Sequence, residues 1–236
     1  MACYTKGMRL FLAATLLLTS CGRPPPVSPT TGIDIAAAEP RVRYKWSFDP
    51  APHFAPSPPS PIQSTVSHTR LLAVLGSWEV ARDENAPSAP FVMKLERADA
   101  HPARLLVERL GFTSVSARAK CRIDDTREDA SCGVIFGARA EDNYFVARID
   151  GREIRLLHIV GAVELELGKS TALVERATFH DVMVWARGGD AFVSLDGALQ
   201  FSAKIDEIPL SRVGLFARGD ASFDDLSAMA LDRPEE

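Results

Sequence analysis

The amino-acid sequence predicts an all-β sandwich, and three observations lead to that prediction. Short runs rich in β-branched, aliphatic and aromatic residues recur at intervals of roughly 8–12 residues, as they do in β-sandwiches. Apolar and polar residues alternate within several of these runs, most clearly over 182–187 and 192–195. Turn sequences such as Gly188-Gly189 and Asp196-Gly197 separate the runs.

The expected strands begin with 44–48, which alternates like a strand, and continue almost to the end of the chain. The others are 71–75, 78–82, 91–96, 104–107, 113–120, 133–139, 144–150, 153–160, 163–167, 180–187, 191–195, 199–203, 212–217 and 222–231. A proline-rich stretch, 50–61, follows the first strand. We interpret it as a long surface loop of the domain, with additional tether as the alternative.

The chain begins with the pattern of a secretory signal peptide. Lys6 and Arg9 precede an apolar run, 10–18, which is too short to span a bilayer. The run leads to Leu18-Thr19-Ser20-Cys21, which resembles a bacterial lipobox, the motif whose cysteine is acylated and becomes the mature N-terminus. The alternative is an ordinary secretory signal in which Cys21 has no such role.

The lipobox resemblance implies a protein of the bacterial cell envelope that is held at a membrane by its lipid anchor alone. Gly22, rather than an aspartate, follows the cysteine, and in such lipoproteins this favours the outer membrane. We therefore expect three parts: a signal peptide at 1–20, the lipidated Cys21 with a proline-rich tether at 21–42, and a sandwich domain at 43–232.

Charge argues against one class of partner. The formal net charge is −4, and it falls to about −6 when Lys6 and Arg9 leave with the signal peptide. Because a mildly acidic chain without a basic stripe lacks the electrostatic footprint of a nucleic-acid-binding protein, we expect no nucleic acid partner.

Two cysteines remain once Cys3 leaves with the signal peptide and Cys21 is acylated. Cys121 and Cys132 flank a polar loop between two expected strands, and an oxidising compartment favours their pairing. If the two strands form a hairpin, the cysteines face each other and can form a disulfide, with two free thiols as the alternative. A zinc site is not expected, because no His or Cys lies at ligand spacing.

A series of sheet-building motifs runs through the domain: 46–49, 76–80, 133–139, 142–148, Phe179-His180, 186–188, 193–197, 212–216 and 223–226. Their order resembles the concanavalin A-like jelly roll, and most closely the bacterial secreted domains classed with 3-keto-disaccharide hydrolases and family 16-like glycoside hydrolases. The resemblance implies two stacked antiparallel sheets with ligands on the concave one. It implies glycan binding, glycan cleavage or adhesion without choosing among them.

The candidate ligand-binding residues are Arg139, Tyr144, Arg148 and Trp185. Tyr144 and Arg148 share one face of their strand, opposite the apolar residues that we expect in the core, and Arg139 on the neighbouring strand is expected to join them. An aromatic ring can stack on a sugar, and a guanidinium donates paired hydrogen bonds. The alternative is an ordinary exposed face with the Arg stem packed over Tyr. Trp185 is expected either as a sugar platform or as a cover for the rim of the sandwich.

Acidic residues suggest two further sites. Glu164 and Glu166 lie two apart on a strand, at a spacing close to that of retaining glycosidase carboxylates, although alternation of Glu with apolar residues is equally typical of a half-exposed strand. Asp224 lies where many jelly rolls hold a structural calcium ion, and no other cofactor is expected. No nucleophile elbow, P-loop or dinucleotide-binding motif is present, so no catalytic residue is identified.

The sequence therefore predicts a lipid-anchored envelope protein that binds a glycan or polysaccharide on its concave sheet. Two alternatives stay open: a 3-keto-disaccharide or other glycoside hydrolase, and a structural envelope protein that binds another protein.

Overall fold

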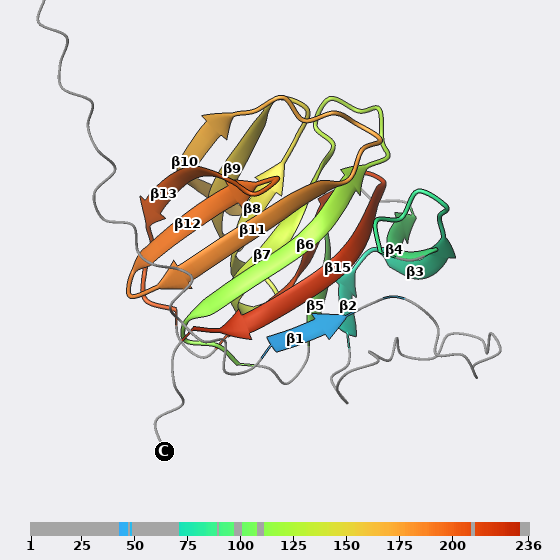
Figure 1. The fold of residues 1–236 in the computed structure, drawn as a ribbon. Coiled ribbons are helices and arrows are strands. Elements are labelled where there is room, and N and C mark those ends of the chain that lie inside the picture. Colours follow the sequence, from blue (N-terminus) through green and yellow to red (C-terminus); the bar gives the residue numbers. More distant parts are fainter. Residues whose placement is uncertain are drawn as a thin grey trace, which may run out of the picture. The chain divides into compact units, whose positions relative to one another are not determined.

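The computed structural model describes residues 43–46, 48, 71–88, 90–96, 101–107, 111–208 and 211–231. Within these ranges every regular element is a β-strand, and the strands form two antiparallel sheets that stack face to face (Figure 1). This confirms the predicted all-β jelly-roll sandwich. The expected signal peptide, Cys21 and its tether lie outside the described residues, as does the proline-rich stretch 50–61. Among the described residues, no helix is long and apolar enough to cross a membrane.

Sheet I contains eight strands. Seven of them follow in the order β13 (Ala198–Lys204), β12 (Asp190–Leu195), β11 (His180–Arg187), β6 (Val115–Ile123), β15 (Ala221–Ala230), β4 (Phe91–Glu96) and β3 (Ser77–Arg82). The eighth strand, β1 (Arg43–Trp46), pairs with the second half of β15, whereas β4 pairs with its first half. The long strand β15 therefore holds the first described strand of the domain in place.

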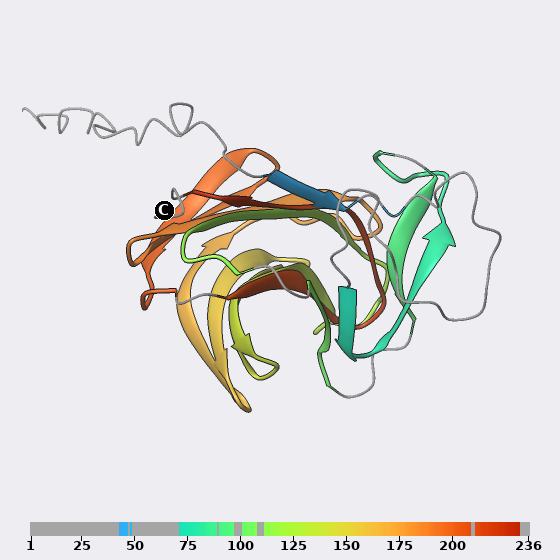
Figure 2. The ribbon, with the colours of Figure 1, turned by 90° about the horizontal axis from the view of Figure 1, so that it is seen from below.

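Sheet II contains seven strands. Their order is β10 (Val163–Thr171), β9 (Glu153–Val160), β8 (Asn143–Ile149), β7 (Ser131–Ala140), β14 (Arg212–Arg218), β5 (Ala103–Val107) and β2 (Leu71–Leu75). Figure 2 shows that this sheet is arched, with its hollow side turned away from sheet I. The outer face of sheet II is therefore the concave face of the sandwich.

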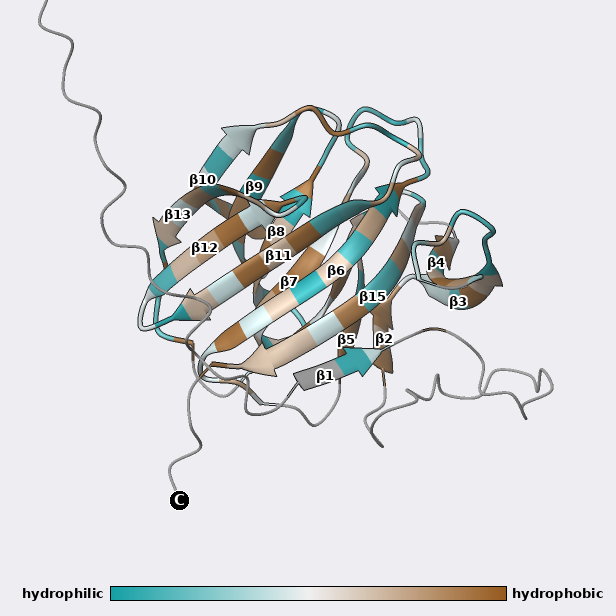
Figure 3. Cartoon of the chain, in the orientation of Figure 1, coloured by the Kyte–Doolittle hydropathy of each residue, from teal (hydrophilic) through white to brown (hydrophobic). Residues whose placement is uncertain are grey.

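Alternation along the strands places one face of each sheet in the core. On β6, Ala117, Ala119 and Cys121 are buried in the core, whereas Arg118 and Lys120 are half-exposed on the outer face. Figure 3 shows the same alternation as bands of hydropathy along this strand. Because apolar side chains of both sheets meet in this core, burial of apolar surface is the main source of its stability.

The expected hairpin between the two cysteine-bearing strands is wrong. β6 belongs to sheet I and β7 to sheet II, because the loop between them crosses from one sheet to the other. Cys121 and Cys132 still meet, across the core, as buried free thiols. Burial, followed by a hydrogen bond with the Cys121 thiol, raises the pKa of Cys132. Their disulfide stays a prediction.

Candidate functional site

The concave outer face of sheet II divides into an apolar half and a polar half. Strand β8 contributes to both halves. Its residues Phe145 and Ile149 lie in the core, as predicted, whereas Tyr144 and Arg148 lie on the outer face. Tyr144 belongs to a second apolar cluster, separate from the core, and Arg148 lines a polar cavity. The two residues predicted to act together therefore lie in different surroundings.

The apolar half consists of Leu106, Ile135, Ala138, Tyr144, Val146, Leu157, Ile159 and Phe216. Tyr144 is only 2% exposed, and the guanidinium carbon of Arg104 lies 5.7 Å from the centre of its ring. Burial raises the pKa of the Tyr144 phenol, although the nearby Arg104 acts in the opposite direction. The ring is enclosed, so it does not provide the open platform that stacking on a sugar requires.

Arg139 does not join the other predicted residues of sheet II. Strand β7 contains a bulge near its end, where Gly137 has a φ of 62°. The extra residue places Ala138, instead of Arg139, in the apolar cluster. Arg139 is exposed, and its Nη2 donates a hydrogen bond to the carbonyl oxygen of Glu207 at 2.9 Å.

Trp185 lies on the other sheet. It belongs to β11 of sheet I, where it is half-buried and points away from the core, on the face opposite Val184, as predicted. Its cross-strand neighbours are Phe192 and Ser116. Trp185 therefore lies on the outer face of sheet I and cannot share a ligand with the concave face of sheet II. The alternation of residues predicts the face of a strand on which a side chain lies, but not the sheet to which the strand belongs.

The polar half of the concave face contains a cavity of about 660 Å³. Its charged lining consists of five arginines and four acidic residues: Arg148, Arg152, Arg155, Arg176, Arg218, Glu128, Asp129, Asp150 and Glu153. We call this cavity the arginine pocket. It lies where β8 ends and β9 begins, at one end of the sheet.

Sheet register explains why arginines from distant parts of the sequence meet here. Arg148 pairs with Arg155 on β9 and with Gly133 on β7, and β14 contributes Arg218 on the far side of β7. A Cβ atom at Gly133 would lie 2.1 Å from the carbonyl oxygen of Ala147. Glycine is therefore required for β7 and β8 to approach this closely beside Arg148.

Arg148 is the most enclosed arginine of the pocket, with only 9% of its side chain exposed. Its Nη1 lies 3.1 Å from Oε2 of Glu164, while Nη2 of Arg218 donates a hydrogen bond to Oε1 of Glu164 at 2.8 Å. Among the described residues, neither Nε nor Nη1 of Arg148 has a partner with hydrogen-bond geometry. Burial lowers the pKa of Arg148, and the charges of Arg218 and Arg155 lower it further against the opposing charge of Glu164.

The other arginines have closer partners. Arg155 contacts Glu153, and its Nη2 lies 3.7 Å from Asp150. Arg152 pairs with Glu128 at 2.6 Å in a largely exposed ion pair. The guanidinium of Arg176 donates to the carbonyl oxygens of Asp125 and Arg127. The pocket thus presents guanidinium donors and carboxylate acceptors side by side.

Glu164 and Glu166 turn to different cations. Glu164 reaches from β10 to Arg148 and Arg218, whereas Glu166 lies 3.1 Å from Lys169 on its own strand. A bulge follows Glu166 in the pairing of β10 with β9. This arrangement gives no support to a glycosidase carboxylate pair at these two residues.

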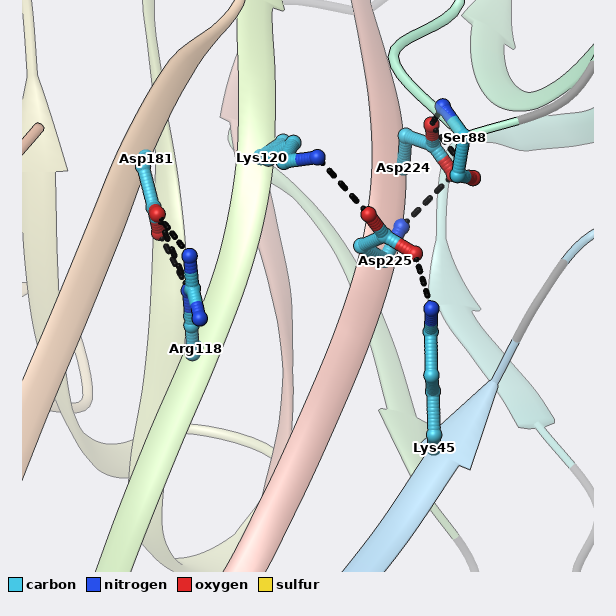
Figure 4. Close-up of polar contacts among 7 residues, drawn as sticks. All are labelled: Lys45, Ser88, Arg118, Lys120, Asp181, Asp224 and Asp225. Carbon is cyan, nitrogen blue, oxygen red and sulfur yellow. Dashed lines mark hydrogen bonds and ion pairs between the residues drawn. The ribbon is translucent and has the colours of Figure 1, made fainter.

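Asp224, the candidate calcium ligand, is fully buried. Its carboxylate accepts hydrogen bonds from the backbone N and Oγ of Ser88 at 2.9 and 2.8 Å and from the backbone N of Asp225 at 2.7 Å (Figure 4). Asp225 pairs with Lys45 at 2.6 Å and with Lys120 at 2.8 Å. In the described part of the chain, no group of three or more His, Cys, Asp or Glu residues could hold a metal ion. Calcium stays an untested prediction.

The sequence analysis missed Arg155 and Arg218. Arg155 alternates with the buried residues Ile154 and Leu156, and Arg218 follows the buried Ala217, so each could have been assigned to the outer face of its strand. What the alternation does not show is that β9 and β14 lie on either side of β7 and β8. Only the order of strands in the sheet brings these arginines to Arg148.

Solved structures share this fold. The carbohydrate-binding module CBM66 from Bacillus subtilis matches with a TM-score of 0.58 and 14% sequence identity, over 68% of this chain and 95% of that one. A Crh5 transglycosylase in its apo form gives a TM-score of 0.54 at 10% identity, over 81% of this chain and 85% of that one. A Bacillus subtilis protein of unknown function with a galectin-like fold gives 0.50 at 11% identity, over 72% and 93%.

These likenesses establish the fold, because sequence identities this low do not carry function from one protein to another. No protein-family model matches the sequence, and a search of curated proteins also gives no match.

Proposed function

We propose that this protein binds a glycan in the arginine pocket of sheet II. The observation that carries the proposal is the pocket itself: about 660 Å³ of space lined by guanidinium and carboxylate groups. Small-molecule sites commonly enclose about 300–1,000 Å³. A sugar hydroxyl both donates and accepts hydrogen bonds, so neighbouring arginines and carboxylates can hold adjacent hydroxyls.

The lining also indicates how a sugar would be held. Every residue that lines the pocket is Arg, Asp, Glu, Ser, Thr or Gly, and none is aromatic. Recognition would therefore depend on hydrogen bonds and charge instead of stacking on a ring. Such contacts depend strongly on geometry, which favours discrimination between sugars over high affinity.

The shared fold supports this proposal. CBM66 is described as a carbohydrate-binding module, and 95% of that module matches the fold of this chain. The concave position of the arginine pocket agrees with the expectation from the jelly-roll resemblance, in which ligands lie on the concave sheet.

A glycoside hydrolase is the second candidate, and the matching fold of the Crh5 transglycosylase keeps it open. Asp150 and Glu153 are the carboxylates of the pocket that lie nearest to Arg155. If the protein is a hydrolase, we expect turnover of a bound oligosaccharide to stop in Asp150→Asn or Glu153→Gln. Binding without turnover would reject this candidate.

We further propose that the domain is presented at the bacterial envelope by a lipid on Cys21, as the motif Leu18-Thr19-Ser20-Cys21 suggests. The wild-type protein expressed in a bacterial host should partition into detergent, whereas Cys21→Ser should stay in the aqueous phase. Equal partitioning of the two proteins would reject the anchor.

Glycan binding is tested by screening the purified protein against immobilised oligosaccharides and measuring affinity for each hit by calorimetry. We expect Arg155→Ala to weaken binding about tenfold or more, because a charged hydrogen-bond donor is lost from the pocket. Trp185→Ala is the matched control, since Trp185 lies on sheet I, and it should leave affinity unchanged. The opposite pattern would move the site to sheet I, and a panel with no hit would favour a protein partner.

A further inference from the structure

One carboxylate that pairs with two arginines of the pocket occupies an unusual position. Glu164 lies on β10, an edge strand of sheet II, yet its side chain reaches Arg148 on β8 and Arg218 on β14. A single carboxylate is thus held between two guanidinium groups.

The carboxylate of Glu164 leaves hydrogen-bond donors of these guanidinium groups without an acceptor. Arg218 donates a hydrogen bond of 2.8 Å to Glu164, but Arg148 makes only a 3.1 Å ion pair without hydrogen-bond geometry. The Nε of Arg148 is buried and has no hydrogen-bond partner in the described part of the chain. Buried donors are usually satisfied in folded proteins, so an unsatisfied guanidinium that lines a cavity points to a missing acceptor.

The charge of the site points in the same direction. Arg155 has its own partners in Glu153 and Asp150, whereas Arg148 and Arg218 share Glu164 between them. With Glu164 the pocket has five carboxylates for its five arginines, so it is the local sharing of Glu164 by Arg148 and Arg218 that favours a better placed negative group. A guanidinium fork binds carboxylate, sulfate and phosphate oxygens in pairs, which a neutral hydroxyl cannot match.

Building on the glycan function proposed above, we propose that the arginine pocket selects sugars that carry an anionic group, bound between Arg148 and Arg218. In the absence of such a ligand, the carboxylate of Glu164 occupies this place. Uronic acids, sulfated sugars and phosphorylated sugars share the required chemistry.

Glu164 is suited to being displaced. Its side chain is 35% exposed, so its own charge can be solvated by water when it rotates away from the two arginines. A ligand anion that replaces it keeps the charge of Arg148 and Arg218 compensated. The ligand also gains the hydrogen bonds to Arg148 that Glu164 does not make.

The first experiment compares four small probes by calorimetry: glucose, glucuronate, glucose 6-sulfate and glucose 6-phosphate. The sugar ring is constant, so any difference reports the anionic group and identifies which anion fits. We expect at least one acidic probe to bind about tenfold or more tightly than glucose. The preference should decline as salt is raised, because charge provides it.

The second experiment uses three variants, two on β10 and one on β14. Glu164→Gln removes the internal competitor, so it should tighten binding of the preferred acidic probe several-fold, while Arg218→Gln should abolish the preference. Glu166→Gln is the matched control, because Glu166 is also a charged residue of β10 but pairs with Lys169. It should leave all four affinities unchanged.

The outcomes separate this inference from the function on which it rests. Equal binding of glucose and every acidic probe, or weaker binding of the acidic probe by Glu164→Gln, would overturn the anionic preference while leaving glycan binding in place. No binding of any of the four probes or of any oligosaccharide in the panel would overturn both.

Discussion

Two clusters of charged side chains, one associated with each sheet, differ in what they surround: one joins strands and the other lines a cavity. On sheet I, Asp225 pairs with Lys45 and Lys120, and Asp224 accepts hydrogen bonds from the backbone and hydroxyl of Ser88 (Figure 4). These contacts join β15 to β1, to β6 and to the turn between β3 and β4. We call this group the Asp224–Asp225 cluster.

The charged groups of the arginine pocket on sheet II surround a cavity. There one carboxylate, Glu164, is shared by Arg148 and Arg218, and part of the Arg148 guanidinium is buried without a hydrogen bond. Oδ1 of Asp225 also lacks a hydrogen bond, but it lies 2.6 Å from Lys45, and the Asp224–Asp225 cluster joins strands. A cluster with an unsatisfied guanidinium beside a cavity contributes less to stability and is suited to binding a ligand.

The largest expected effect concerns the link between the two sheets that carry these clusters. If Cys121 and Cys132 form their predicted disulfide, reduction should lower the free energy of unfolding by about 3 kcal/mol, because the bond closes a short loop in the unfolded chain. Urea unfolding with and without reductant measures this difference. Two thiols that react with a thiol reagent after unfolding of the unreduced protein would contradict the prediction.

The second effect tests the structural role of the Asp224–Asp225 cluster. Asp224→Ala should lower the free energy of unfolding by about 2 kcal/mol or more, because the buried carboxylate accepts hydrogen bonds from Ser88 and Asp225 that the variant loses. Asp190→Ala is the control, since the Lys204–Asp190 pair is largely exposed and should be worth less than about 1 kcal/mol. Equal losses in the two variants would remove the distinction between the cluster and an ordinary surface pair.

The smallest effect is a difference in pH dependence. Burial alone would raise the pKa of Asp225, but the hydrogen bonds and charges of Lys120 and Lys45 together lower it below its usual value of 3.8. A lowered carboxylate pKa stabilises the fold above that value, and this contribution is lost as the pH falls through the pKa of the folded state. Arg148, whose pKa is also lowered, is a base and keeps its proton in acid, so it adds no such loss.

Melting temperature measured between about pH 5 and pH 2 should therefore fall less steeply in Asp225→Asn than in the wild-type protein. Parallel curves for the two proteins would show that Asp225 carries no part of the acid sensitivity.

The strands themselves could be predicted closely from the sequence. The expected strands 71–75, 91–96, 153–160 and 180–187 have the same bounds as β2, β4, β9 and β11. Alternation and glycine turns are local signals, so a short window of sequence is enough to locate a strand.

The site could be predicted only in part, because it depends on which sheet each strand joins. Trp185 and Tyr144 have similar alternation, but β11 and β8 lie in different sheets. The bulge at Gly137 removed Arg139 from the concave face, although each residue around it fits a regular strand. Arg148 was found because its own strand shows its face, whereas its partner Arg218 comes from a strand that is distant in the sequence.

Strand β10 has a further consequence for the behaviour of the protein in solution. Among the described strands it forms one edge of sheet II, and Val163 and Leu165 on it are 55% and 50% exposed. An exposed apolar edge invites pairing with a strand of another molecule, which leads to aggregation. The charges of Glu164 and Glu166, which alternate with these residues, and the bulge that follows Glu166 oppose such pairing. The side chain of Glu164 would therefore contribute both to the solubility of the protein and to its selection of ligands.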